Sequence, residues 1–125
     1  MNRLKFLLES AKFEVWAYEV AGIIIATFTF WRSPEQQLIE YNAGRSSVKT
    51  GNHQLWLAKD YCVVDDKNEN WSVDKDEIRW SFDPNNPNDP YLILGIEWEK
   101  RGGIWGGRWN KGGKTGFSDP YHFEG

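Results

Sequence analysis

The chain of 125 residues contains only two histidines, and each lies near an aspartate. His53 precedes Asp60 by seven positions, and Asp119 precedes His122 by three. Seven residues span about 23 Å in a straight strand and about 10 Å along a helix axis. If His53 and Asp60 are to bind one ion, the backbone must therefore bend between them. We place this bend around residues 54–56, with Asp60 on a strand.

The second pair makes a smaller demand, because one tight turn brings Asp119 and His122 to the same side of the chain. Pro120 favours such a turn by fixing its own φ angle. Two imidazoles and a carboxylate are a common ligand set for a catalytic zinc ion that keeps a fourth position open for water. The second aspartate can then take a proton from that water. A single histidine is more often a surface or core residue, but the two pairs together indicate a small zinc hydrolase.

The rest of the pattern predicts an α+β fold with a small antiparallel sheet flanked by about three helices. Ser33-Pro34 and Asp89-Pro90 each place an N-cap residue before a proline at the first helical position, and Gln36 is the expected capping-box partner of Ser33. The expected helices are residues 2–20, 33–44 and 89–100, and the expected strands are 23–30, 55–64 and part of 78–82. The apolar face expected for the first helix comprises Leu4, Leu7, Leu8, Ala11, Val15 and Tyr18. The strand at 23–30 has the composition of a buried strand.

Size and composition limit the remaining possibilities. The length predicts one domain over residues 1–125 and leaves no room for a second, separate module. The net charge of -3, with no basic stripe, argues against a nucleic-acid partner. The lone Cys62 excludes an intrachain disulfide and is expected to be a small buried hydrophobe. The uncharged stretch 21–31 is only 11 residues long, whereas a transmembrane helix needs about 20. We therefore expect no stable membrane insertion. We also expect a monomer.

Four segments resemble, in order, the motifs of the M15 family of zinc peptidases, which act on bacterial cell-wall peptides. W-R-S-P-E-Q-Q at residues 31–37 is similar to the family's Y-R-[ST]-x-x-x-Q, and N-H-Q-L-W-L-A-K-D at 52–60 to its S-x-H-x-x-G-x-A-x-D. L-G-I-E-W-E-K-R-G-G-I-W-G-G-R-W at 94–109 resembles L-G-x-x-W-x-x-x-G-x-x-W-G-G-x-[WF], and D-P-Y-H-F-E at 119–124 resembles D-x-x-H-F. The most similar members are small phage and prophage endolysins with L-alanyl-D-glutamate peptidase activity.

The resemblance implies a fold of the Hedgehog/DD-peptidase type and a Zn²⁺ ion bound by His53, Asp60 and His122. Asp119 is implied to be the general base, and Arg32 to stabilise charge on the scissile carbonyl. Trp105, Gly106 and Gly107 are expected to support the site, and Glu124 is expected either to lie behind the ligands or to be exposed.

The substrate implied by the resemblance is the stem peptide of peptidoglycan, cut between L-Ala and D-Glu. The sequence starts without a recognisable signal peptide. We therefore expect a phage endolysin that is made in the cytoplasm of the host bacterium and reaches the cell wall through a holin-type lesion, where it causes bacteriolysis.

Three positions depart from the family pattern. Gly51 replaces a serine, Trp56 replaces a glycine, and Lys59 replaces an aliphatic residue. Two alternatives stay open, and Gly51 and Trp56 suggest the second of them. One is a D-Ala-D-Ala carboxypeptidase or dipeptidase, which would share the metal chemistry. The other is a catalytically inactive cell-wall-binding or phage structural protein, which a measurement of bound metal would distinguish from an enzyme.

Overall fold

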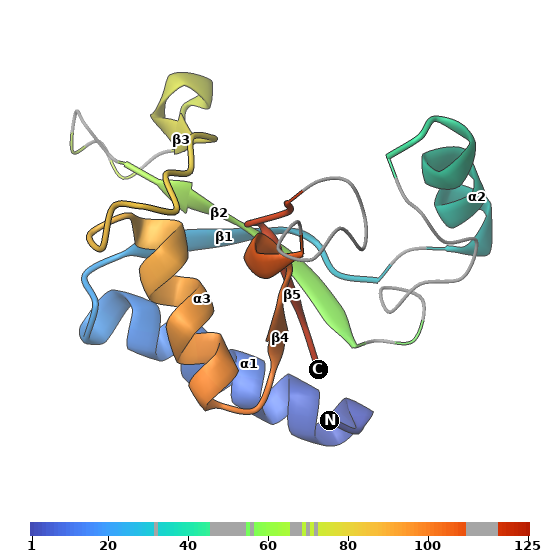
Figure 1. Ribbon diagram of the computed structural model, residues 1–125, viewed down its shortest axis with the longest axis horizontal. Coiled ribbons are helices and arrows are strands. Elements are labelled where there is room, and N and C mark those ends of the chain that lie inside the picture. The colour runs from blue at the N-terminus through green and yellow to red at the C-terminus, as the bar shows by residue number, and fades with distance from the viewer. Residues whose placement is uncertain are drawn as a thin grey trace.

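The computed structural model describes residues 1–31, 33–45, 55, 57–65, 69, 71, 73–109 and 118–125. One five-stranded antiparallel sheet organises this part of the chain, with the order β1-β2-β5-β4 and with β3 paired to the far end of β2. Helices α1 and α3 pack together against the sheet, whereas α2 stands apart from both of them, near the other end of the sheet (Figure 1). The predicted α+β class, the antiparallel sheet and the three helices are confirmed.

The three helices are α1 (Arg3–Glu19), α2 (Pro34–Asn42) and α3 (Pro90–Lys100). Two of them, α2 and α3, begin where the sequence places their caps. The hydroxyl of Ser33 accepts a hydrogen bond from the backbone N–H of Gln36 at 3.1 Å, as an N-cap should. The reciprocal half of the predicted capping box is replaced by another bond, because the side chain of Gln36 donates to Glu40 at 2.8 Å.

The five strands are β1 (Ile24–Thr29), β2 (Ala58–Val64), β3 (Ile78–Arg79), β4 (Ile104–Trp105) and β5 (His122–Glu124). The chain also forms two short 3₁₀ helices, η1 (Lys75–Glu77) and η2 (Gly106–Arg108). Strand β2 lies between β1 and β5 and is buried along almost its whole length, including Cys62. Strand β1 is an edge strand, and only partly covered. The prediction that this segment is fully buried was therefore wrong.

The buried face of α1 also differs from the prediction. The residues that α1 buries are Phe6, Ser10, Phe13 and Ala17, at helical spacing. Most of the predicted apolar face, including Leu4, Leu8 and Val15, is exposed. Because α1 carries apolar side chains on two faces, periodicity alone could not decide between them. The larger aromatic rings of the second face fill the core.

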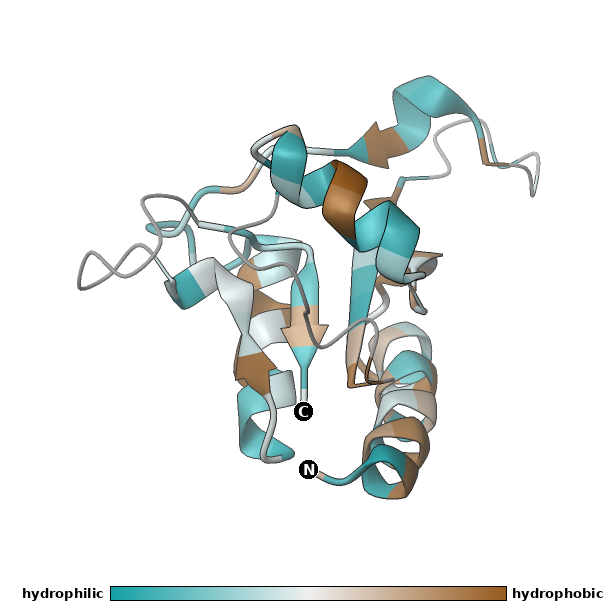
Figure 2. Ribbon diagram, turned by 90° about the vertical axis from the view of Figure 1, so that its right-hand side faces the viewer, coloured by the Kyte–Doolittle hydropathy of each residue, from teal (hydrophilic) through white to brown (hydrophobic). Residues whose placement is uncertain are grey.

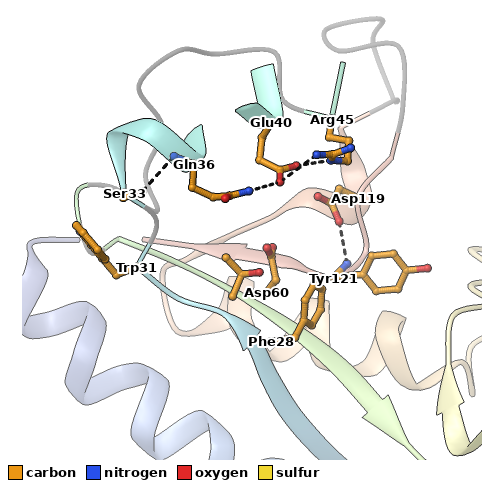
Figure 3. Close-up of a pocket in the computed structure, with 10 residues that line it drawn as sticks. Phe28, Trp31, Ser33, Gln36, Glu40, Arg45, Asp60, Asp119 and Tyr121 are labelled. Carbon is orange, nitrogen blue, oxygen red and sulfur yellow. Dashed lines mark hydrogen bonds and ion pairs between the residues drawn. The ribbon is translucent and has the colours of Figure 1, made fainter. Parts of the chain in front are cut away.

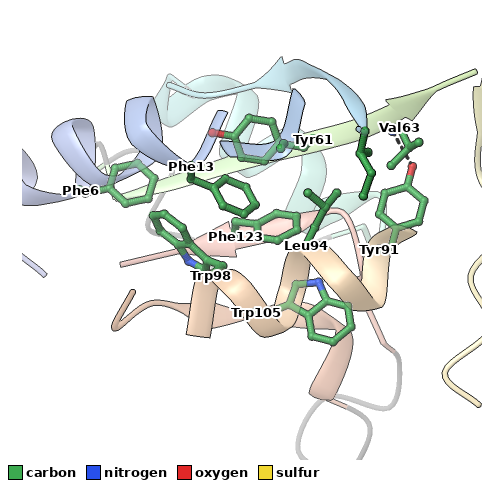
Figure 4. Close-up of a cluster of buried hydrophobic side chains, with 11 residues drawn as sticks. Phe6, Phe13, Tyr61, Val63, Tyr91, Leu94, Trp98, Trp105 and Phe123 are labelled. Atoms are coloured by element: carbon green, nitrogen blue, oxygen red, sulfur yellow. Dashed lines mark hydrogen bonds between the residues drawn. The ribbon is translucent and has the colours of Figure 1, made fainter. Parts of the chain in front are cut away.

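The core is a cluster of aromatic side chains between α1, α3 and the sheet (Figure 4). The ring of Phe13 is at its centre, with centroid distances of 5.3 Å to Trp98, 5.5 Å to Phe123 and 5.8 Å to Tyr61. Edge-to-face and tilted pairs of this kind add stability beyond the area that they bury. This packing holds β2 and β5, the two strands that carry the site, against α1 and α3.

Hydropathy differs among the helices. Figure 2 shows α2 as a largely hydrophilic helix with one hydrophobic turn, whereas α1 carries apolar residues along its length. None of the helices in the described part of the chain combines the length and the apolar character needed to cross a bilayer.

Candidate metal centre

Asp60 and His122 face each other across two neighbouring strands. Asp60 on β2 is the register partner of His122 on β5. Side chains at directly opposed positions of an antiparallel pair start only about 5 Å apart. Both side chains are buried, with 10% and 11% of their surface exposed. The sheet therefore holds a carboxylate and an imidazole together without help from a flexible loop.

The separation of these two groups suits a shared metal ion. Oδ1 of Asp60 lies 3.3 Å from Nδ1 of His122. Two ligands that are each about 2.0 Å from one tetrahedral zinc ion are about 3.3 Å apart. Asp119 completes the cluster, because one ligand atom from each of Asp60, Asp119 and His122 lies within 4.8 Å of the other two. The carboxylate of Asp60 and the imidazole of His122 are ligand types that fit zinc, and the second carboxylate lies beside them in a mostly buried site.

A tight turn brings Asp119 to the site, as its spacing from His122 predicted. The backbone N–H of His122 donates to the carbonyl of Asp119 at 3.2 Å, and a carboxylate oxygen of Asp119 accepts from the N–H of Tyr121 at 3.2 Å. The N–H of Asp119 donates in turn to the carbonyl of Gly106 at 3.0 Å. A Cβ atom at Gly106 would lie 2.4 Å from the carbonyl oxygen of Asp119, so only glycine fits there.

The W-G-G segment supports this turn from behind. The indole N–H of Trp105 donates to the carbonyl of Pro120 at 2.9 Å, and the hydroxyl of Ser118 donates to the carbonyl of Gly107 at 3.0 Å. The ring of Trp109 packs on the imidazole of His122 at a centroid distance of 4.8 Å. The supporting role predicted for Trp105, Gly106 and Gly107 therefore has a physical basis in this geometry.

His122 has a second acidic neighbour. Its Nε2 lies 3.4 Å from a carboxylate oxygen of Glu124, on the side of the ring away from Asp60. Burial lowers the pKa of His122, but hydrogen bonds to Asp60 and Glu124 and the charges of these two carboxylates outweigh it. The net result is a pKa raised to about 9. The site thus attracts positive charge strongly in the absence of a metal.

A cleft opens directly over the two aspartates (Figure 3). Its volume is about 710 Å³, enough for a segment of peptide. Phe28 and Tyr121 form an aromatic wall, and their rings are 6.5 Å apart. Phe28 lies at an irregularity in the register between β1 and β2, and such a bulge re-aims a side chain.

The opposite wall of the cleft comes from α2 and the residues after it. Gln36 donates to one carboxylate oxygen of Glu40 at 2.8 Å, and Nε of Arg45 donates to the other at 2.6 Å (Figure 3). The hydrogen bond and the charge of Glu40 raise the pKa of Arg45, so this side chain stays cationic. Among the described residues that line the cleft, Arg45 is the one that carries a positive charge at every working pH.

Two of the predicted site residues and one structural demand fall outside the described residues. These are His53, Arg32 and the bend around residues 54–56, of which Leu55 alone is described. Two of the departures from the family pattern, Gly51 and Trp56, also fall there. Of the predicted site residues, the described part of the chain brings together Asp60, Asp119 and His122.

The third departure, Lys59, has a structural explanation. Its ammonium group lies 3.3 Å from a carboxylate oxygen of Glu14 on α1 and 5.0 Å from the centre of the Phe30 ring. The hydroxyl of Tyr61 donates to the same oxygen of Glu14 at 3.0 Å. Lys59 and Tyr61 point to the face of β2 that meets α1, opposite to Asp60. The change at this position therefore ties the strand to the helix and leaves the metal site alone.

Sequence reasoning did not predict a role for Arg45, Glu40 or Phe28 in the cleft. No motif marks them, because they meet only through the placement of α2 and β1 around the sheet. Glu124 was expected either to lie behind the ligands or to be exposed, and its position two residues after His122 puts both side chains on one face of the strand.

No protein-family model and no curated protein sequence matches the chain. Solved structures do match. An L-Ala D-Glu endopeptidase from Serratia marcescens, ChiX, superimposes with a TM-score of 0.64 at 17% identity, covering 93% of this chain and 77% of its own. The vancomycin-resistance D,D-pentapeptidase VanY of a VanB-type cassette, determined with Zn(II), gives 0.53 at 19% identity, covering 98% and 69%.

The chain has the fold of these two peptidases. The predicted resemblance to the M15 peptidases is thus confirmed at the level of the fold, over nearly the whole chain.

Proposed function

We propose that the protein is a zinc-dependent peptidase of peptidoglycan, with Asp60, His122 and His53 as the metal ligands. The observation that carries this proposal is the distance of 3.3 Å between Asp60 and Nδ1 of His122, which suits two ligands of one tetrahedral ion. The shared fold supports it, because one similar structure was determined with Zn(II) and both similar proteins are named as peptidases.

The residues of the chain have separate tasks in this reaction. Zinc supplies a Lewis acid and lowers the pKa of water from about 16 toward about 7. Asp119 accepts the proton of the attacking water and then returns it to the leaving amine. The half-buried carboxylate of Asp119 is held in place for this by the turn to His122. Arg32 is proposed to stabilise negative charge on the carbonyl oxygen.

The proposed substrate bond is the one between L-Ala and D-Glu in the stem peptide. The likeness to an enzyme named for this bond supports the choice. The cleft adds a physical argument, because D-Glu carries a free carboxylate and Arg45 lies in the wall opposite the aspartates. Its guanidinium has five N–H donors, of which two bind Glu40. We further propose that the protein acts as a monomeric endolysin, reaching the wall after a holin-type lesion.

Mass spectrometry of digested muropeptides tests this function directly. Purified protein is incubated with permeabilised Gram-negative cells or with isolated muropeptides. Three samples are compared: one without chelator, one with chelator, and one in which zinc is added back after the chelator. We expect cleavage between L-Ala and D-Glu that stops with chelator and returns with zinc. Absence of any peptide cleavage in the presence of zinc would contradict the proposal and favour a non-catalytic wall-binding or phage structural protein.

The same experiment separates the second candidate, a D-Ala-D-Ala carboxypeptidase or dipeptidase. The likeness to VanY, a D,D-pentapeptidase, favours it. Release of D-Ala from the end of a pentapeptide stem, with the L-Ala–D-Glu bond intact, would identify that activity.

A further inference from the structure

Glu124 is the one acidic neighbour of His122 that the proposed reaction leaves without a task. It lies on β5 two residues after His122, so both side chains point to the same face of the strand. Its Oε1 is 3.4 Å from Nε2 of His122, and its side chain is only 13% exposed. The contact is therefore well shielded from water.

The backbone of Glu124 is fixed on three sides. It pairs with Ala58 on β2 and with Ile104 on β4, and its carbonyl accepts a hydrogen bond from the indole of Trp98 at 2.8 Å. Trp98 itself is fully buried in the aromatic core. A carboxylate on so rigid a support can hold an imidazole ring in one orientation.

The two nitrogens of His122 face different partners. Nδ1 points to Asp60 at 3.3 Å, within the cluster that also includes Asp119. Nε2 points to Glu124. A neutral imidazole carries one proton, and here carboxylates lie beside both nitrogens. An ion bound by Asp60 would take the lone pair of Nδ1, so the proton would stay on Nε2 beside Glu124. With the proton on Nε2, the lone pair of Nδ1 is directed at the metal site.

We propose that Glu124 is a positioning residue of the metal centre: its carboxylate accepts a hydrogen bond from Nε2 of His122 and fixes the tautomer in which Nδ1 binds the metal. This inference rests on the proposed zinc site. Carboxylates that orient a metal-bound histidine in this way typically change metal affinity 10- to 100-fold. The ring of Trp109, whose centroid lies 4.8 Å from that of the imidazole, restricts the rotation of His122 further.

The test measures zinc affinity by competition with a chromophoric chelator. Glu124→Ala is expected to weaken zinc binding about 10- to 100-fold. Glu124→Gln keeps an acceptor oxygen but loses the charge, so its loss is expected to be smaller, about two- to tenfold. Glu97→Ala is the matched control, because Glu97 is similarly shielded but pairs with Arg101 and not with the site. Its zinc affinity should equal that of the wild type.

A second readout reports the tautomer itself. The chain has only two histidines, so ¹⁵N spectra of histidine-labelled, zinc-loaded protein are simple to assign. The wild type should show His122 protonated on Nε2 and bound to zinc through Nδ1. Glu124→Ala should lose this single pattern, and Glu124→Gln should retain it. A purely structural role for Glu124 would lower stability without changing the tautomer.

The outcomes separate this inference from the proposed function. If the wild type binds no zinc, the proposed function fails. If the wild type binds zinc and Glu124→Ala has the same zinc affinity and the same His122 tautomer, the proposed role of Glu124 is wrong. It is also wrong if Glu124→Gln and Glu124→Ala weaken zinc binding equally. If Glu124→Ala does not fold, Glu124→Gln decides, and an unchanged zinc affinity in that variant would overturn the inference.

Discussion

Asp60, Asp119 and His122 are held by three different local devices. Asp60 is fixed by the central strand, His122 by its register with that strand, and Asp119 by the turn that precedes β5. Substitution of these residues should have different effects, because the proposed ligands Asp60 and His122 bind zinc whereas the proposed base Asp119 transfers a proton.

Asp119→Ala is expected to retain zinc and lose hydrolysis by at least 100-fold, since general bases typically contribute 10²- to 10⁴-fold to the rate. His122→Ala is expected to lose both zinc and activity. Metal analysis and muropeptide digestion on the same two variants check this. Full activity in Asp119→Ala would disprove its role as the base.

Gly106 is a second residue with a specific demand. A methyl group there would collide with the carbonyl of Asp119 at 2.4 Å and press on His122. We expect Gly106→Ala to destabilise the protein by about 2 kcal/mol and to weaken zinc binding, because the turn must shift. Gly102→Ala is the control. It costs about 1 kcal/mol through its left-handed backbone, with φ of +93°, but has open space around it and should leave zinc affinity unchanged. Unchanged zinc affinity in both variants would show that the turn does not position the site.

At the scale of elements, helix starts could be predicted from sequence and side-chain placement could not. Ser33-Pro34 and Asp89-Pro90 mark α2 and α3 because capping is a local interaction. The buried face of α1 was mispredicted because it depends on which aromatic rings fill a distant core. The two His–Asp pairs and the family resemblance both predicted that Asp60 and His122 share one site. Their strand register could not be predicted, since pairing between residues 62 positions apart is not a local property.

Substitution of Asp89 measures how much the N-cap of α3 contributes to stability. The carboxylate of Asp89 accepts hydrogen bonds from the N–H groups of Tyr91 and Asp83, both at 2.9 Å, and it is buried. We expect Asp89→Ala to lower the free energy of unfolding by about 2 kcal/mol, and Ser33→Ala, which loses one exposed bond, by about 1 kcal/mol. Urea unfolding measures both. Equal losses would show that the second bond of Asp89 contributes nothing.

At the scale of the whole molecule, the aromatic core links α1 to the strands of the site. A buried tyrosine of this core also makes the free energy of unfolding depend on pH in the alkaline range. Burial, followed by the charge and the hydrogen bond of Glu14, raises the pKa of Tyr61 far above its usual value of about 10. Below pH 10 the tyrosine is neutral in both states. Above pH 10 it ionises only in the unfolded chain, so stability is lost as the pH rises.

We expect the free energy of unfolding to fall above pH 10 by up to about 1.4 kcal/mol per pH unit from this one group. Tyr61→Phe should be less stable at neutral pH but should show a shallower fall above pH 10. Tyr18→Phe, at an exposed position of α1, should keep the wild-type slope. Chemical unfolding at several pH values checks this, and a wild-type slope in Tyr61→Phe would contradict it.

Whether β2 and β5 together hold a zinc ion is tested most directly by diffraction from zinc-loaded crystals, recorded at the zinc absorption edge. The account predicts one strong anomalous peak about 2.0–2.2 Å from both Nδ1 of His122 and a carboxylate oxygen of Asp60. A zinc peak elsewhere on the molecule, or none beside these two side chains at saturating zinc, would contradict it.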